Sequence, residues 1–225
     1  MIKKIQLVAL LRILVVIGGV AGGILFFFKQ LAGSGQWRKG IVEKDLNLLK
    51  ESISKLKRDL VDLDEEELPL LSLKQKRSKV RMKSKKLLAG TFQSIYEENL
   101  VSYSTMTYQS GHHLIVAQTS EQEFVYRLKN KITDVYVNGS FVGQLNDKGE
   151  LIHPVHKNVI AEIDNSFGNK FQVVTKDGSK MAKLLNPLVK HDDHERVLND
   201  IEIAREDDRL ILLSLTFLNM IERTH

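Results

Sequence analysis

A single apolar stretch near the N-terminus constrains this chain more than any other feature. Residues 7–28 read LVALLRILVVIGGVAGGILFFF, a run of 22 residues with one charge, Arg12. At about 1.5 Å per residue, a helix of this length crosses a hydrocarbon core of about 30 Å. The sequence therefore predicts a single-pass membrane protein with a transmembrane anchor over residues 1–30.

The glycines of the anchor form two GxxxG pairs, Gly18 with Gly22 and Gly19 with Gly23. Such pairs permit close helix packing, or they reflect the ordinary composition of membrane helices. Residues 32–34 resemble a signal-peptide cleavage site. The apolar run is longer than the about 7 to 15 residues of a usual signal peptide, so a retained anchor is favoured.

The orientation of the anchor is read from the basic residues that flank it. The counts nearly balance, with Lys3, Lys4 and Arg12 at one end and Lys29, Arg38, Lys39 and Lys44 beyond the other. A later basic run tilts the balance, because Lys and Arg near the membrane favour the cytoplasmic side. The C-terminal region is therefore expected in the cytoplasm.

The segment after the anchor carries a heptad pattern. Its aliphatic residues alternate in spacing between four and three, at Val42, Leu46, Leu49, Ile53, Leu56, Leu60 and Leu63. This seam predicts a helix that forms either a short coiled coil or an amphipathic helix lying against the folded domain. A coiled coil would join copies of the chain into a homo-oligomer through residues 42–63. We predict a helical linker over residues 31–68, which an acidic cluster and Pro69 bring to an end.

A basic run follows, and residues 69–89 are predicted to be a basic linker. It holds eight basic residues and no acidic one within residues 74–86: Lys74, Lys76, Arg77, Lys79, Arg81, Lys83, Lys85 and Lys86. The run would attract anionic lipid headgroups, at about 1 kcal/mol per charge near the surface, or an acidic partner. The alternative is a solvated basic face whose charge is balanced by the acidic cluster beside it. No aromatic residue interrupts the run, so base stacking is unsupported and no nucleic acid is expected.

From residue 90 to residue 225 the pattern is that of a mostly β domain. Short β-rich stretches are expected at residues 124–126, 134–137, 159–163 and 171–175. Asn138-Gly139 and Asp177-Gly178 predict hairpin turns, because these residue types tolerate the positive φ of primed turns.

A five-residue sequence pattern recurs in this domain, at residues 141–145, 159–163 and 180–184. Each copy places a small residue two positions before an aliphatic one, so both face the same side of a strand. The small residues Gly143, Ala161 and Ala182 would leave room on that side for something bulky. Their neighbours Gln144, Glu162 and Lys183 would face the opposite, solvated side.

The bulky object is predicted to be a C-terminal helix. Residues 210–221 are apolar nearly all round, and Asp207 and Asp208 suit the start of a helix. Twelve helical residues reach only about 18 Å, too short for a bilayer, and a helix that is apolar on all sides belongs in a core.

These hairpin strands with their Asn-Gly and Asp-Gly turns, the acidic pair and the terminal aliphatic helix resemble the superfamily of tubby C-terminal domains, phospholipid scramblases and LURP-one-related proteins. The resemblance covers residues 90–222. It implies a closed antiparallel barrel around a buried C-terminal helix, and a tubby-like function in binding phosphoinositides. The chain lacks the Cys-rich and Pro-rich stretches of many scramblases, which puts a scrambling activity in doubt.

The sequence contains no recognised catalytic or cofactor motif. The chain has no cysteine, which excludes disulfides, thiol nucleophiles and Cys-ligated metals. The histidines at 112–113, 153–156 and 191–194 do not form a recognised metal motif, and no GxSxG, Walker, GxGxxG or HExxH sequence occurs. We therefore predict no catalytic residue, no metal site and no cofactor.

The leading functional hypothesis is a non-enzymatic, membrane-tethered binding module for lipid headgroups or a protein partner. The first alternative is a membrane-anchored hydrolase or metal-dependent enzyme that uses the histidine-rich loops. The second is an oligomeric membrane scaffold in which the heptads associate.

Overall fold

The computed structural model describes residues 39–81, 86–108, 111–164, 170–186, 189, 191–203 and 205–222. The chain divides into two compact units, Met1–Asp45 and Leu46–His225. Helix α2 (Lys39–Ser54) begins in the first unit and ends in the second, which holds all the other described elements. The predicted anchor lies outside the described residues, and no helix within them has the length and apolar character needed to cross a membrane.

The second unit is built on one antiparallel sheet. Among the described residues it has twelve strands, and each pairs with its neighbours in sequence. In order they are β1 (Leu71–Arg81), β2 (Lys86–Ser94), β3 (Asn99–Thr107), β4 (His113–Gln118), β5 (Glu123–Lys129), β6 (Ile132–Val137), β7 (Ser140–Leu145), β8 (Glu150–Ile152), β9 (Val159–Ile163), β10 (Phe171–Lys176), β11 (Ser179–Leu185) and β12 (Leu198–Asn199).

The two ends of this sheet meet. Ser72 of β1 forms an antiparallel bridge with Arg196, just before β12. The Val197 amide donates a hydrogen bond to the Leu71 carbonyl at 2.8 Å. The result is a nearly closed antiparallel barrel, which confirms the coarse prediction of a mostly β domain.

Two of its hairpin turns are the ones that the sequence predicts. Asn138 and Gly139 have φ values of 50° and 77° between β6 and β7. Asp177 and Gly178 have nearly the same values, 49° and 77°, between β10 and β11. Two successive positive φ angles define a type I′ turn, whose twist matches that of the flanking strands.

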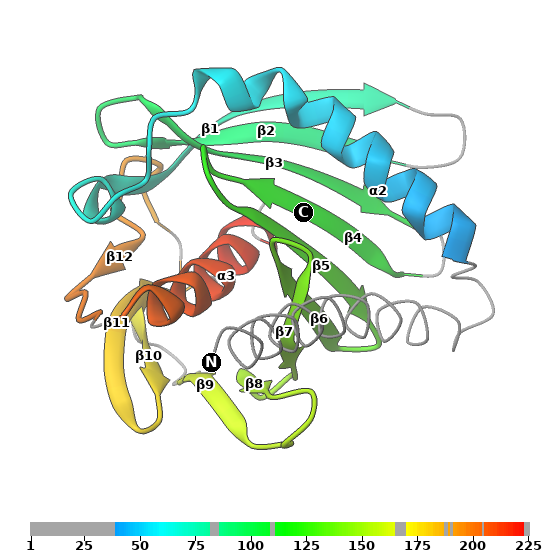
Figure 1. Cartoon of the computed structure of the whole chain (residues 1–225). Coiled ribbons are helices and arrows are strands. Elements are labelled where there is room, and N and C mark those ends of the chain that lie inside the picture. The colour runs from blue at the N-terminus through cyan, green and yellow to red at the C-terminus, as the bar shows by residue number, and fades with distance from the viewer. Residues whose placement is uncertain are drawn as a thin grey trace, which may run out of the picture. The chain divides into compact units, whose positions relative to one another are not determined.

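The interior of the barrel is filled by α3 (Glu206–Glu222), which contains the predicted C-terminal helix. Side chains alone can fill a barrel of about eight strands, and a wider barrel needs an additional element inside it. Figure 1 shows α3 between β4–β6 on one side and β10–β12 on the other. Every residue of α3 from Ile211 to Ile221 is buried.

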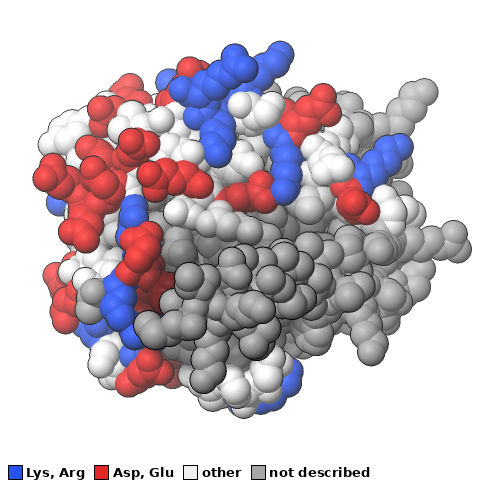
Figure 2. All heavy atoms as spheres, in the orientation of Figure 1, with Lys and Arg blue, Asp and Glu red and all other residues white. Residues whose placement is uncertain are grey.

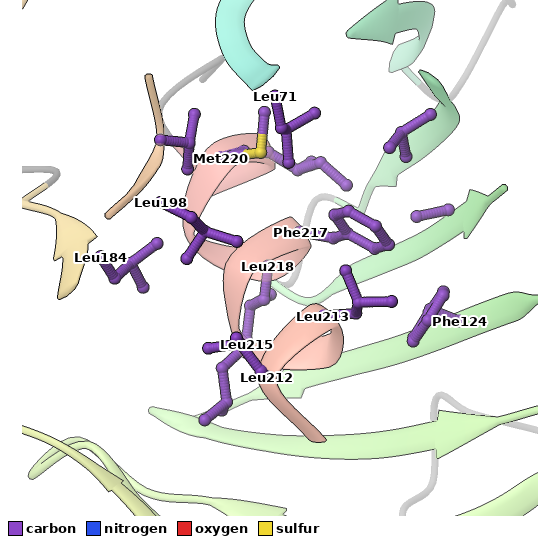
Figure 3. Packing of buried hydrophobic residues seen from close by; sticks show 14 of the residues in the cluster. Leu71, Phe124, Leu184, Leu198, Leu212, Leu213, Leu215, Phe217, Leu218 and Met220 are labelled. Atoms are coloured by element: carbon purple, nitrogen blue, oxygen red, sulfur yellow. The ribbon is translucent and has the colours of Figure 1, made fainter. Parts of the chain in front are cut away.

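Both sides of α3 pack against strands. The ring of Phe217 meets that of Phe124 edge to face, with 5.0 Å between centroids. Figure 3 shows Leu184 and Leu198 on the side of the helix opposite Phe124. A polar contact adds to this packing, because the hydroxyl of the fully buried Tyr126 donates to the Ser214 carbonyl at 2.8 Å. The helix is thus held around its circumference.

Helix α3 explains the small residues of the recurring five-residue pattern only in part. Ala161 and Ala182 are buried in the same core cluster as α3, as predicted. Gly143 differs, because a Cβ there would lie 2.6 Å from the carbonyl oxygen of Ile152 in β8. The small residue at this position therefore makes room for the backbone of the neighbouring strand, and not for the helix.

The structure differs from the sequence prediction at residues 69–89. The segment expected as a linker contains 3₁₀ helix η2 (Leu68–Leu70), all of β1 and the start of β2, so the sheet begins at Leu71. The apolar residues of this segment explain the difference, because Leu71 and Leu88 both enter the barrel core. The many basic residues of β1 made its sequence look like a linker and not like a strand.

The heptad segment is helical over only part of its length. Within the second unit, Leu49 and Ile53 of α2 are completely buried, and the Leu49 carbonyl accepts a hydrogen bond from the Ser104 hydroxyl of β3 at 2.9 Å. Lys50 pairs with Glu123 of β5 at 2.6 Å. Over residues 46–54 the helix therefore lies against the barrel, the second of the two predicted arrangements. A homo-oligomer through residues 42–63 stays a prediction.

After Ser54 the chain leaves the α-helix. Residues Leu56–Asp59 form 3₁₀ helix η1, and the Val61 amide then donates to the Asn99 carbonyl at 2.8 Å. Leu63 enters the barrel core. The helix ends early because both backbone and side chain find partners in the barrel, so the predicted helical linker over residues 31–68 is too long at its C-terminal end.

Candidate functional site

The basic run forms a hairpin at the first edge of the sheet. Lys74, Lys76, Arg77, Lys79 and Arg81 lie on β1 and Lys86 on β2, while Lys83 and Lys85 lie outside the described residues. The strands pair in continuous register from Gln75↔Phe92 to Arg81↔Lys86. We refer to residues 71–81 and 86–94 as the basic hairpin.

The charges whose side chains are described differ in their surroundings. Lys74 pairs with Glu97, and the hydrogen bond from Lys74 is the main cause that lowers the pKa of the Glu97 carboxyl. Lys76 and Arg77 are exposed, and neither forms an ion pair among the described residues. Two of these three basic side chains are therefore open to an anionic ligand.

The acidic cluster lies in the segment between η1 and η2. Asp62, Asp64, Glu65 and Glu66 are all exposed, and Figure 2 shows acidic side chains gathered on this part of the surface. Asp64 accepts hydrogen bonds from the Glu66 and Glu67 amides and so stabilises a turn. In the described part of the chain no ion pair joins this cluster to Lys76 or Arg77, which leaves the basic hairpin without that compensation.

A second candidate site, which the sequence did not predict, is a cavity of about 420 Å³ at the end of the barrel where α3 terminates. Its walls come from the ends of β5, β7 and β9 and from one stripe of α3. On the helix the stripe consists of Leu215, Leu218, Asn219 and Glu222, spaced as one helical face. We call this space the end cavity.

Asn219 is the unusual member of that stripe. It is 8% exposed, and its Oδ1 atom has no hydrogen-bond partner in the part of the chain that the structure describes. The other polar residues of the buried helix do have partners: the Ser214 hydroxyl donates to the Ile211 carbonyl at 2.7 Å and the Thr216 hydroxyl to the Leu212 carbonyl at 2.8 Å. Asn219 is among the residues that line the cavity, but its Oδ1 atom has almost no accessible surface.

The charged groups around the end cavity nearly cancel. Lys129 and Lys131 line it together with Asp147 and Glu222, and Lys131 lies 3.8 Å from Asp147. Desolvation raises the pKa of the Glu222 carboxyl, which lies one turn beyond Asn219 on the same face. The lining of the end cavity is therefore mixed in charge and holds both donors and acceptors.

The histidines have structural surroundings. His191 Nε2 donates to the Asn186 carbonyl at 2.8 Å, its Nδ1 lies 3.1 Å from a Glu195 carboxylate oxygen, and the side chain is almost completely enclosed. His153 stacks on His156 at 4.8 Å. No group of three or more potential metal ligands occurs among the described residues. These contacts give the enzyme hypothesis no support.

One signal in the sequence pointed to the end cavity. Within the apolar run 210–221, Asn219 is the one carboxamide. The wall opposite it comes from three successive hairpins, β5–β6, β7–β8 and β9–β10, which lie far from α3 in sequence and meet it only in the folded barrel. Comparison of the chain with family models, curated protein sequences and solved structures found no significant match.

Proposed function

We propose that this chain is a non-enzymatic, membrane-tethered binding module of the tubby and scramblase-like type, and that its basic hairpin binds anionic lipid headgroups. One observation carries the proposal. The basic run stands on a continuously paired hairpin, on which Lys76 and Arg77 are exposed and form no ion pair among the described residues. Positive charge that forms no direct ion pair is what an anionic leaflet attracts.

The fold supports the family part of this proposal. A nearly closed antiparallel barrel with a helix at its C-terminus is compatible with the barrel that the resemblance implies. The predicted anchor at residues 7–28 supports the membrane part, because it would keep the hairpin close to a bilayer. With such tethering, weak headgroup contacts suffice for stable engagement.

Vesicle co-sedimentation tests the lipid-binding surface. We expect a protein of residues 31–225 to bind vesicles of phosphatidylserine and phosphatidylcholine, and to lose binding when Lys76, Arg77, Lys79, Arg81 and Lys83 are changed to Gln. Each near-surface charge contributes about 1 kcal/mol, and 1.4 kcal/mol is tenfold in affinity, so the loss should exceed about tenfold. Binding of the unaltered protein should also fall as salt is raised.

A charge-matched control separates the hairpin from net charge. It removes five exposed basic residues elsewhere: Lys55, Lys57, Arg58, Lys148 and Lys157. This control should retain most of the vesicle binding. Equal losses in both variants, or binding that does not respond to salt, would refute a role for the basic hairpin.

A further inference from the structure

The first strand of the barrel has an open edge. After the bridge at Ser72, the Leu73 amide donates to the Glu195 carbonyl at 3.4 Å. Beyond Leu73, no strand in the described part of the chain pairs with this side of β1, whose other side stays paired with β2 as far as Arg81. One row of backbone N–H and C=O groups over residues 75–81 therefore has no strand partner among the described residues. We call this row the β1 edge.

The edge is open because β12 is too short to cover it. Strand β12 consists of Leu198–Asn199, and it pairs with β11. The pairing of β1 with β2 shifts in register between Leu71 and Gln75, an irregularity of the kind that bends a strand. Figure 1 shows β1 continuing beyond the seam and away from β12. The gap in the nearly closed barrel therefore lies along residues 75–81.

Both faces of β1 are accessible beside this edge. Successive residues of a strand point to opposite faces of the sheet. Lys76 and Arg77 are adjacent and both are exposed, so neither face is covered at this point. Their neighbour Gln75 is held in place by Tyr103, whose hydroxyl donates to its Oε1 atom at 2.7 Å. An incoming strand therefore reaches the edge at residues 76–77 without displacing packed side chains.

The charge of β1 indicates what kind of strand fits beside it. Its sequence, LSLKQKRSKVR, holds five basic residues and no acidic one. Opposite charges on paired strands stabilise the pair, and like charges destabilise it. A second copy of β1 is therefore a poor partner, and lysine on an edge strand is a common means of preventing such self-association. The complementary strand is an acidic one.

We propose that the β1 edge binds an extended acidic peptide of a partner protein, which adds a strand to the sheet beside residues 75–81. In such strand addition, main-chain hydrogen bonds supply affinity and alternate side chains supply specificity. A typical strand of about five to six residues spans most of this edge. Lys76 and Arg77, which form no ion pair among the described residues, would contact the acidic side chains.

This inference does not rest on the proposed headgroup binding. A lipid headgroup needs only the charged side chains of the basic hairpin, whereas the peptide also needs the backbone groups of the β1 edge. The two proposals therefore differ in a property that a probe can test.

Backbone methylation of a probe peptide separates strand addition from attraction by charge. The parent probe is fluorescein-labelled Glu-Val-Glu-Thr-Glu-Val-Glu, and fluorescence anisotropy measures its affinity for the full chain in phosphatidylcholine nanodiscs, with empty nanodiscs as the blank. Two further probes carry N-methyl groups, one on every Glu and the other on Val and Thr, so that each lacks the N–H donors of one edge. At least one methylated probe should bind at least about tenfold more weakly than the parent, because it loses several hydrogen bonds.

Two outcomes would overturn the proposal. One is the absence of saturable binding by the parent probe. The other is equal affinity of all three probes, which would mean that charge alone attracts them and would leave the basic hairpin as a site for anionic surfaces such as lipid headgroups.

Charge reversal tests the location. The double variant Lys76→Glu, Arg77→Glu should bind the parent probe at least about tenfold more weakly than the unaltered chain does. It should also gain affinity for a probe in which Lys replaces every Glu, a gain that misfolding could not produce. The control Lys148→Glu, Lys157→Glu makes the same change of net charge at exposed residues elsewhere and should bind both probes like the unaltered chain.

Equal effects in the two double variants would show that the peptide does not bind at the β1 edge. Vesicle binding and peptide binding are separate measurements, so the two proposals can fail separately. Vesicle binding without peptide binding would refute the β1 edge alone, and peptide binding without vesicle binding would refute the headgroup proposal alone.

Discussion

Gly143 shows how a single missing Cβ sets the distance between two strands. An added Cβ would lie 2.6 Å from the Ile152 carbonyl oxygen, and backbone cannot move aside as a side chain can. We therefore expect Gly143→Ala to lower the free energy of unfolding by about 1 to 3 kcal/mol, the usual cost of overpacking. Urea denaturation of residues 31–225 measures this.

Gly40→Ala is the control for that substitution. Among the described residues nothing lies within 4 Å of a Cβ at Gly40, which is in a helix where alanine is preferred. It should leave stability unchanged or slightly higher. Equal stability of both variants would show that the approach of β8 to β7 is not tight.

The neighbours of single residues could not be predicted from the sequence. Ala161 and Ala182 fit the prediction of small residues beneath a helix, and Gly143 looked identical to them in sequence. The sequence pattern indicated that each of these positions needs a small residue. Which neighbouring group limits the space there depends on how the strands pair. The same limit explains why the end cavity was not predicted, because Leu145, Ile163 and Leu218 meet only in the folded barrel.

At the scale of elements, the first turn of α3 is held by charge. Arg205 donates to both carboxylate oxygens of Asp208 at 3.2 Å, and Lys176 of β10 also pairs with it. These hydrogen bonds, that from Arg205 first, lower the pKa of the Asp208 carboxyl below its ordinary value of 3.8. The carboxylate also lies near the positive end of the helix dipole.

The lowered pKa of Asp208 determines how the stability of the fold depends on pH. Because the folded-state pKa is below the unfolded one, ionised Asp208 stabilises the fold above about pH 4, and this contribution is lost as the pH falls through the folded pKa. Asp208→Asn should lower stability at pH 7 by about 1 kcal/mol or less, since Arg205 is largely solvent-exposed. The difference from the unaltered protein should shrink as the pH falls below 3.8.

Thermal unfolding at pH 7 and pH 3 measures this difference. Asp193→Asn removes the same charge from an exposed residue and should change stability little at either pH. A deficit in Asp208→Asn that persists undiminished at pH 3 would show that shape, and not charge, matters at this position.

Elements were predicted well where one physical signal dominated. The apolar run at 210–221 specified α3, because burial on all sides admits few alternatives. The heptads specified a helix but not its end, since the barrel supplies partners for Val61 and Leu63 that no local pattern reveals. The strand β1 was missed because its charges outweighed the alternation of its faces.

At the scale of the molecule, the barrel and α3 depend on each other. A sheet of twelve strands encloses more space than its own side chains fill, and a helix apolar on all sides is insoluble alone. Neither can be stable without the other, so the domain should unfold as one cooperative unit. The sequence implied this dependence through its resemblance to a barrel family, but it did not specify twelve strands or the bridge from Ser72 to Arg196 that nearly closes them.

Phe217 tests that mutual dependence most directly. Its side chain is completely buried and contacts Phe124 across the interior. Truncation of a buried Phe to Ala costs about 3 to 5 kcal/mol, a large part of a total stability of about 5 to 15 kcal/mol. Phe217→Ala should therefore unfold or severely destabilise residues 31–225, whereas Val155→Ala, at a residue that is 72% exposed, should not.

Removal of residues 205–225 extends the test from one side chain to the whole helix. The strands would then enclose an empty apolar interior, with Leu71, Phe124 and Leu184 losing their partners on α3. We expect this protein to be insoluble when expressed. A shortened protein that stays soluble and shows the same urea midpoint as the complete domain would mean that the barrel is stable without its helix, because no loss of core contacts of this size could leave the midpoint unchanged.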